Sequence, residues 1–105
     1  QQRHLIVKSD RKKLSIDLDE LLFIESLADY CKLHTNDNQI ITKEKISRLE
    51  EILPDHFIRT HRSYIVNAQK INSFSSEKVI INAIEIPISR TYKKSVRNLL
   101  EAKEK

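Results

Sequence analysis

The chain has 105 residues, close to the most common length of one domain, so we expect a single compact core. Its 19 Lys and Arg exceed its 15 Asp and Glu, and the formal charge of +4 permits an anionic partner without requiring one. Glycine is absent, which excludes the glycine-rich phosphate loops of P-loop and dinucleotide-binding enzymes.

The sequence also bears on the setting of the domain. No apolar run approaches the ~20 residues that cross a bilayer, so we expect a soluble domain without a membrane partner. The single cysteine, Cys31, excludes an internal disulfide and fits a reducing cytoplasm. Because Gln1 is neither an initiator Met nor part of a signal-like stretch, we expect a fragment of a longer protein that lacks an N-terminal domain. Within one domain spanning 1–105, residues 1–12 are expected to be a linker or a first strand.

Most of the chain shows the strand pattern, in which short segments alternate or run apolar between polar clusters. The expected strands are His4–Lys8, Lys13–Asp17, Leu21–Ser26, Tyr30–His34, Gln39–Thr42, Phe57–Thr60, Tyr64–Asn67, Lys70–Phe74, Lys78–Asn82 and Glu85–Ser89. Turns are expected at Asn36–Asn38 and Ser75–Glu77, because Asn, Asp and Ser bond their own backbone and tolerate turn geometry. A further hairpin at Asn82–Ile84 has weaker turn residues.

Two segments show helical spacing instead. Lys43–Leu53 carries apolar residues three and four positions apart, and Pro54 ends it. The apolar stripe of this helix is Ile46, Leu49, Ile52 and Leu53. A C-terminal helix beginning near Thr91 carries the stripe Tyr92, Val96, Leu99 and Leu100, and residues Ala102–Lys105 are expected to fray.

These elements predict a mainly β fold: about ten short antiparallel strands with one mid-domain helix and a C-terminal helix. The expected core is Phe23, Ile24, Leu33, Ile41, Leu49, Leu53, Phe57, Ile65, Val79, Ile81, Ile88, Val96 and Leu100.

No residue pattern supports catalysis, a metal site or a cofactor. The four histidines lack the paired spacing of structural zinc sites, and alternation places His34 on the opposite face of its strand from Cys31. Ser63 has no nucleophile-elbow context, since that turn requires glycine. The acidic pairs are interpreted as solvated surface.

Two basic segments are more informative. Arg59, His61, Arg62 and Ser63 lie between two short apolar strands, and Ser89–Lys94 joins the last strand to the C-terminal helix. Both combine Arg or Lys with hydroxyl side chains, which reach phosphate oxygens and guanine edges. A helix that starts near Thr91 would also direct free backbone amides at a phosphate. On chemistry alone, nucleic-acid contact and ordinary solvated turns both remain open.

The segment Phe57–Asn67 reads FIRTHRSYIVN and closely resembles the F-x-R-x-H-R-S-Y-x-V-N signature of LytTR domains, found in the LytR/AgrA family of bacterial response regulators. Three further matches occur in the order of that family. Phe23–Ser26 with Asp29–Lys32 resembles its "I-E-A…N-Y-V" strand and loop, Lys43–Leu53 its mid-domain helix, and Ile86–Arg90 its "P-V-S-R" strand end. Together the matches cover roughly residues 13–100.

The resemblance implies an elongated ten-stranded domain that lies along double-stranded DNA, usually as a dimer on direct repeats and downstream of a receiver domain. It implies no cofactor and no enzyme activity. Carried over by position, the first major-groove loop falls at Asp29, Tyr30, Cys31 and Lys32. The intervening contact falls at His61 and Arg62, with Arg59 and Ser63 beside them, and the second major-groove loop at Arg90 and Thr91, with Lys93 and Lys94 nearby.

This chain departs from the family pattern at three places. Ala28 and Asp29 stand where Gly or Asn is common. Cys31 stands where some members read a base with a polar ring, which leaves that role open to Tyr30 or Lys32. Thr91 stands where some members use Arg, so Arg90 is the expected base reader. Of the remaining basic residues, Arg59 is open to either DNA contact or an ion pair within the sheet.

The competing interpretation is a β-rich protein-interaction module with no nucleic-acid role, in which the basic turns only aid solubility. An RNA-binding domain is less favoured, because we find no exposed aromatic pair on neighbouring strands to stack bases.

Overall fold

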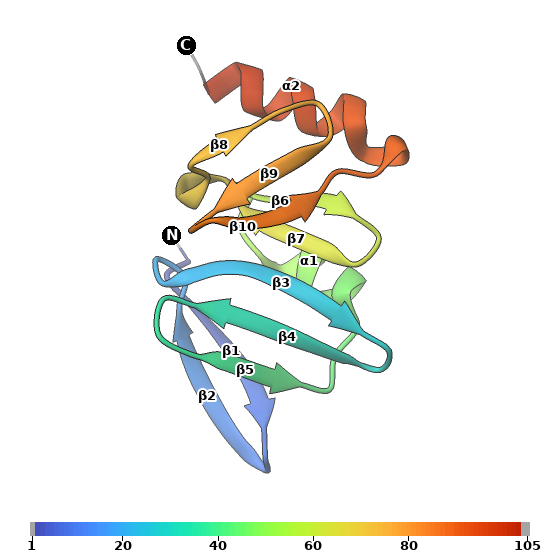
Figure 1. The fold of residues 1–105 in the computed structure, drawn as a ribbon. Coiled ribbons are helices and arrows are strands. Elements are labelled where there is room, and N and C mark those ends of the chain that lie inside the picture. The colour runs from blue at the N-terminus through green and yellow to red at the C-terminus, as the bar shows by residue number, and fades with distance from the viewer. Residues whose placement is uncertain (1, 104–105) are drawn as a thin grey trace.

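Ten strands and two α-helices, with two short 3-10 helices, form the fold of residues 2–103, the part of the chain that the computed structural model describes (Figure 1). In chain order the elements are β1 (His4–Ser9), β2 (Lys12–Asp17), β3 (Leu21–Leu27), β4 (Tyr30–Thr35), β5 (Gln39–Thr42), α1 (Ile46–Ile52), β6 (Phe57–His61), β7 (Tyr64–Asn67), η1 (Ala68–Lys70), β8 (Ser73–Phe74), β9 (Lys78–Ile81), β10 (Ile84–Pro87), η2 (Arg90–Tyr92) and α2 (Lys93–Lys103). The described chain measures 40 × 28 × 25 Å.

The strands form three antiparallel sheets. The central sheet has the order β5-β4-β3-β7-β6, with the β1–β2 hairpin on one side and the β10-β9-β8 sheet on the other. The two helices lie on opposite sides of the central sheet, with α2 outermost at the end that the β8–β10 sheet occupies (Figure 1). The mainly antiparallel β fold with a mid-domain and a C-terminal helix is confirmed.

Each face of the central sheet buries its own apolar cluster. Ile24 pairs with Leu33 on one side and with Ile65 on the other, and these side chains face β1, β2 and α1. Phe23 and Val66 face the β8–β10 sheet and α2 instead. A fully buried Ile, Leu or Phe side chain contributes about 1.5–3 kcal/mol, so both clusters stabilise the sheet between them.

Five of the described residues have left-handed backbone conformations although the chain has no glycine. Asp10 and Arg11 form the β1–β2 turn with φ of 50° and 66°, and Asn82 and Ala83 form the β9–β10 turn with φ of 49° and 68°. Positive φ at both central residues is the geometry that two-residue hairpins prefer, because it matches the twist of the strands. The fifth such residue, Ala28, has φ of 55° in the β3–β4 turn. A side chain with a Cβ is unfavourable there, so these turns carry backbone strain.

Some local predictions are wrong. Strand Lys70–Phe74 shortens to Ser73–Phe74, because the Asn67 side chain accepts the Gln69 amide and starts the 3-10 helix η1. Ile41, placed in the core, is 47% exposed, because its neighbour Thr42 points inward and its hydroxyl donates to the Lys8 carbonyl oxygen.

The helical stripes are also narrower than the sequence suggests. Ile52 on α1 and Leu99 on α2 are exposed, while Leu49, Val96 and Leu100 are buried. Ala102 is helical rather than frayed, and residues 104–105 of the expected frayed end lie outside the described residues.

Candidate nucleic-acid interface

Three loops lie at the same edge of the molecule. They are the β3–β4 turn, the β6–β7 turn and the segment from β10 into η2, which follow one another along the right side of Figure 1. The Ser26 amide at the end of β3 donates to the Ser63 carbonyl oxygen (2.8 Å), and the Ser89 amide after β10 donates to the Thr60 carbonyl oxygen (2.8 Å). The middle loop is therefore bonded to both of its neighbours, and their relative positions are fixed by the backbone.

The middle loop is shaped by a β-bulge. The pairing register between β6 and β7 shifts between Arg59 and His61, so Thr60 has no partner on β7. A bulge bends a strand and redirects the side chains beyond it. Here it precedes the turn, where Arg62 is exposed and His61 and Ser63 are half-buried. The His61 Nδ1 accepts the Ser63 amide (3.0 Å), so a neutral His61 ring would present its N–H at Nε2.

The Arg59 side chain holds this loop in place by hydrogen bonds to its backbone. Its Nε donates to the His61 carbonyl oxygen (2.7 Å), and its Nη2 donates to the Arg62 carbonyl oxygen (2.6 Å). Its Nη1 forms an ion pair with Glu50 of α1 (2.6 Å), and its side chain is only 11% exposed. Arg59 does form an ion pair, but its partner lies on the helix α1, whereas the sequence had suggested a partner within the sheet.

The second outer loop leads directly into a helix. Arg90 and Thr91 are exposed in η2, and the Lys93 amide donates to the Arg90 carbonyl oxygen as α2 begins. Lys94 is exposed and Lys93 half-buried, and no acidic residue lies in the first turn of α2. The exposed cations and the absence of an acidic residue both favour an anion, so this loop is electrostatically suited to phosphate.

The first outer loop is only partly exposed. Asp29 and Tyr30 are exposed and Lys32 is half-buried, whereas Cys31 is fully buried and its thiol donates to the Glu44 carbonyl oxygen (3.2 Å). Burial raises the pKa of Cys31 to about 11, with the Glu44 carboxylate adding to the shift, so the thiol is protonated near neutral pH. In this conformation Cys31 has no exposed surface with which to contact a ligand.

A polar cluster that the sequence does not reveal lies beneath these loops. The Glu25 carboxylate contacts His34 Nε2 and Tyr64 Oη, each at 3.3 Å. The His34 ring stacks on Phe23 with centroids 4.1 Å apart, and the Tyr64 ring meets His61 edge-on at 5.6 Å. Glu25 thus connects the base of the first loop to the middle loop. Its position opposite Tyr64 in the sheet register is a property of strand pairing, which the sequence does not display.

The described residues also bear on two other kinds of site, a metal centre and a membrane-spanning helix. Among residues 2–103, no three His, Cys, Asp or Glu side chains come together as metal ligands would. No helix within the same range is long and apolar enough to cross a membrane.

A β framework with two exposed basic turns, bonded side by side at one edge, defines a domain suited to bind an extended polyanion. The sequence model of the LytTr DNA-binding domain matches residues 11–101, so the chain belongs to the LytTr DNA-binding domain family. This is a family of DNA-binding domains of transcription regulators, which assigns the chain DNA binding in transcription regulation.

Individual relatives agree with this assignment. The chain is 28% identical over 106 residues to the sensory transduction protein LytT of Bacillus subtilis strain 168, covering 94% of this chain and 44% of that protein. It is 34% identical over 107 residues to LytT of Oceanobacillus iheyensis, covering 92% of this chain and 44% of that protein. The chain therefore spans less than half the length of these curated relatives.

A solved structure supports the fold independently. The LytTr DNA-binding domain of a methyl-accepting/DNA response regulator from Bacillus cereus superposes with a TM-score of 0.79, covering 95% of this chain and 98% of that one. The two sequences are 22% identical, so this likeness bears on the fold alone.

Proposed function

We propose that this chain is the sequence-specific output domain of a bacterial response regulator and that its three aligned loops contact one face of double-stranded DNA. The observation that carries the proposal is the adjacency of the Arg62 and Arg90 loops, which the Ser89–Thr60 hydrogen bond holds together. The β3–β4 and η2 loops would enter two successive major grooves, and the Arg62 loop would contact the backbone between them. Nothing in this arrangement calls for a cofactor or for enzyme chemistry.

The side chains divide into two roles. Arg90 is exposed and would donate to a base edge, with guanine O6 and N7 as the best match for its two-pronged group. His61, Arg62, Ser63, Thr91, Lys93 and Lys94 would hold backbone phosphates and set the register. In the first loop Tyr30 and Lys32 remain the candidates for base contact, with Asp29 at the turn.

The wider assembly is part of the same proposal. The LytT relatives are more than twice as long as the region they share with this chain, and their names describe signal transduction. We infer that an upstream receiver or sensor domain controls this domain in the cytoplasm. Two copies would bind direct repeats on the DNA, because each copy presents one row of loops and two rows read a longer site.

The base-reading role is tested with Arg90→Ala. This variant should lose about 1–3 kcal/mol of the discrimination between cognate and scrambled duplexes, the contribution of one good Arg–guanine pair. The matched control is Arg11→Ala in the β1–β2 turn, which lies at the end of the molecule away from α2 (Figure 1). Undiminished discrimination in Arg90→Ala would remove this residue from base reading.

The phosphate-binding role is tested with Lys93→Gln combined with Lys94→Gln. Binding should weaken for all sequences, and the slope of log K against log salt should become less steep by up to about two, since each lost phosphate contact removes ~0.9. The exposed pair Lys12 and Lys13 on β2 supplies the control, changed to Gln in the same way. If wild-type protein shows no salt-dependent binding to any duplex, the protein-interaction alternative is favoured instead.

A further inference from the structure

A hollow of about 310 Å³ lies between α2 and the β8–β9 loop, beside the segment from β10 into η2. Its floor is apolar and consists of Ile88, Val96 and Leu100, all of which are buried. Phe74, which is 40% exposed, lies at its side. A concave site with an apolar lining and a few polar groups at its rim is the usual form of a ligand site.

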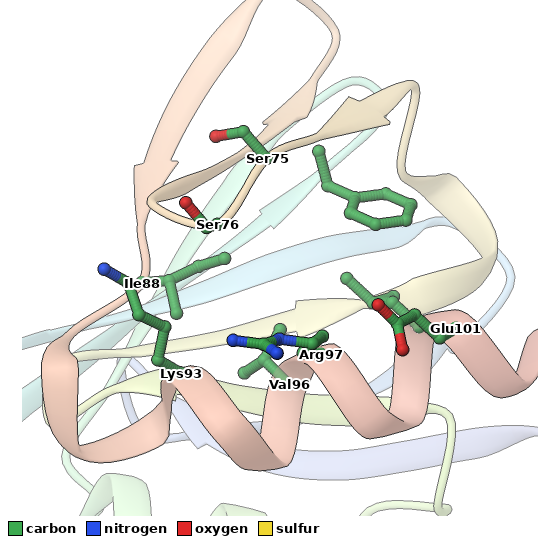
Figure 2. A pocket seen from close by; sticks show the side chains of 9 residues that line it. Ser75, Ser76, Ile88, Lys93, Val96, Arg97 and Glu101 are labelled. Atoms are coloured by element: carbon green, nitrogen blue, oxygen red, sulfur yellow. The ribbon is translucent and has the colours of Figure 1, made fainter.

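The rim of the hollow is polar and has two different ends. Figure 2 shows Lys93 and Ser76 at one end, with Ser75 above them and the Arg97 guanidinium directed along the hollow toward this end. Glu101 lies at the opposite end (Figure 2). The cationic and hydroxyl groups therefore gather at the end where α2 begins, which is the end nearest to Arg90.

The two cations at this end have no anionic partner within the described residues. Lys93 and Arg97 are four positions apart on α2, so they share one side of the helix, and like charges in that arrangement repel each other. The ion pairs found in residues 2–103 involve other side chains. Lys93 is also half-buried, so its charge is less well solvated than that of a fully exposed lysine. An anion between these side chains would reduce their mutual repulsion and would compensate for the poor solvation of the Lys93 charge.

The hollow is continuous with the edge that carries the three loops. The Ile88 amide donates to the Glu77 carbonyl oxygen (2.8 Å), which joins the β8–β9 loop to the segment that leads into Arg90. A strand of DNA that leaves the Arg90 loop in this direction would pass over the hollow. Its phosphate would meet the hydroxyls and cations, and the C–H surface of its deoxyribose would meet the apolar floor.

We propose that this hollow binds one backbone phosphate, with its sugar, of the DNA strand flanking the bases at the Arg90 loop. Arg97, Ser75 and Ser76 then belong to the interface, and Lys93 acts from the hollow rather than from the open surface. This proposal rests on the proposed function and extends the contact surface along α2. Arg, Lys and Ser side chains are common phosphate ligands, and they set register without reading sequence.

The first experiment measures binding by Arg97→Gln and by Ser76→Ala across a range of salt concentrations. Arg97→Gln should weaken cognate and scrambled duplexes alike, by roughly three- to tenfold, and should lower the salt slope by about one. Ser76→Ala should weaken both duplexes without changing the slope, because it removes no charge. Lys12→Gln, an exposed cation on β2, serves as the control and should change neither quantity.

The second experiment locates the phosphate. Phosphates flanking the site are replaced one at a time by uncharged methylphosphonate, and each duplex is titrated with wild type and Arg97→Gln. At one position the substitution should weaken wild type and cause no further loss in Arg97→Gln, as expected for two changes that remove the same contact. Additive losses at every position, or an unchanged salt slope in Arg97→Gln, would refute the hollow as a phosphate site. If either result is obtained while wild type binds DNA normally, the proposed function still stands. If wild type binds no duplex, the phosphate site and the proposed function are both refuted.

Discussion

The guanidinium carbon of Arg59 lies 5.7 Å from the centroid of the Tyr92 ring, a cation–π distance that joins β6 to η2. The same guanidinium donates to the carbonyl oxygens of His61 and Arg62 and pairs with Glu50. One largely buried side chain thus contacts the middle loop, the second outer loop and α1. Arg59 is accordingly a positioning residue, and its charge is already satisfied by the protein.

Replacing Arg59 should therefore disturb DNA binding without removing a phosphate contact. Arg59→Ala should lower the free energy of unfolding by about 1–2 kcal/mol, since it removes three hydrogen bonds whose acceptors are part-buried or exposed. It should also weaken binding to the cognate duplex while the salt slope stays at the wild-type value. Chemical denaturation and salt titrations measure the two effects separately.

Two comparisons decide how Arg59 acts. Arg62→Gln should lower the salt slope by about one with little loss of stability, because Arg62 is exposed. Glu50→Gln should cost at most about 1 kcal/mol, because the Glu50 side chain is 44% exposed and its ion pair is screened by solvent. A reduced slope in Arg59→Ala would mean that Arg59 contacts DNA directly.

The sequence predicts the elements well, because period-two alternation and helical spacing are local properties. The predicted bounds of all ten strands agree with the structure within a few residues, and Ile24, Leu33 and Ile65 lie in the core as predicted. The prediction that Ile41 is buried is wrong, because the neighbouring Thr42 side chain points inward instead. The Thr42 hydroxyl donates to the Lys8 carbonyl oxygen, a contact between segments that are far apart in the sequence. The sequence does not reveal the contacts of the candidate site, such as that of Glu25 with Tyr64, because they also join segments that are far apart in the chain.

The β3–β4 turn provides a test of backbone strain. Ala28 has φ of 55°, where glycine is preferred, so Ala28→Gly should raise the free energy of unfolding by about 1 kcal/mol. Ala68→Gly is the matched control, because Ala68 lies in η1 and is not among the positive-φ residues. It should lower stability by roughly 0.5–1 kcal/mol. Thermal or urea unfolding distinguishes the two signs, and a loss of stability in Ala28→Gly would contradict the turn geometry.

The bulge at Thr60 provides a second stability test. Thr60 is fully buried and its hydroxyl has no hydrogen-bond partner among residues 2–103, a combination that costs about 1–3 kcal/mol. Thr60→Val keeps the shape and removes the unpaired group, so it should raise the free energy of unfolding. Thr60→Ser keeps the hydroxyl and removes a methyl group, so it should lower stability by about 1 kcal/mol. A destabilised Thr60→Val variant would show that the hydroxyl is bonded in solution.

The polar cluster beneath the loops predicts a dependence of stability on pH. Burial against Phe23 lowers the pKa of His34 below its usual 6.5, with a smaller contribution from Lys32, although the Glu25 carboxylate opposes this shift. The unfolded chain therefore takes up a proton at His34 at a higher pH than the folded chain does. Since the unfolded state then binds more protons, stability should fall as pH drops below about 6.5 and level off below the folded pKa.

This dependence can be assigned to His34 by comparing variants. The loss of unfolding free energy between about pH 7.5 and about pH 5.5 should be smaller in His34→Gln than in wild type, because glutamine can still bond Glu25 but does not titrate. His4→Gln controls for an exposed histidine and should retain the wild-type loss. If His34→Gln loses as much stability as wild type over this interval, the acid sensitivity comes from other groups. In that case the stacking of His34 on Phe23 does not hold its ring neutral.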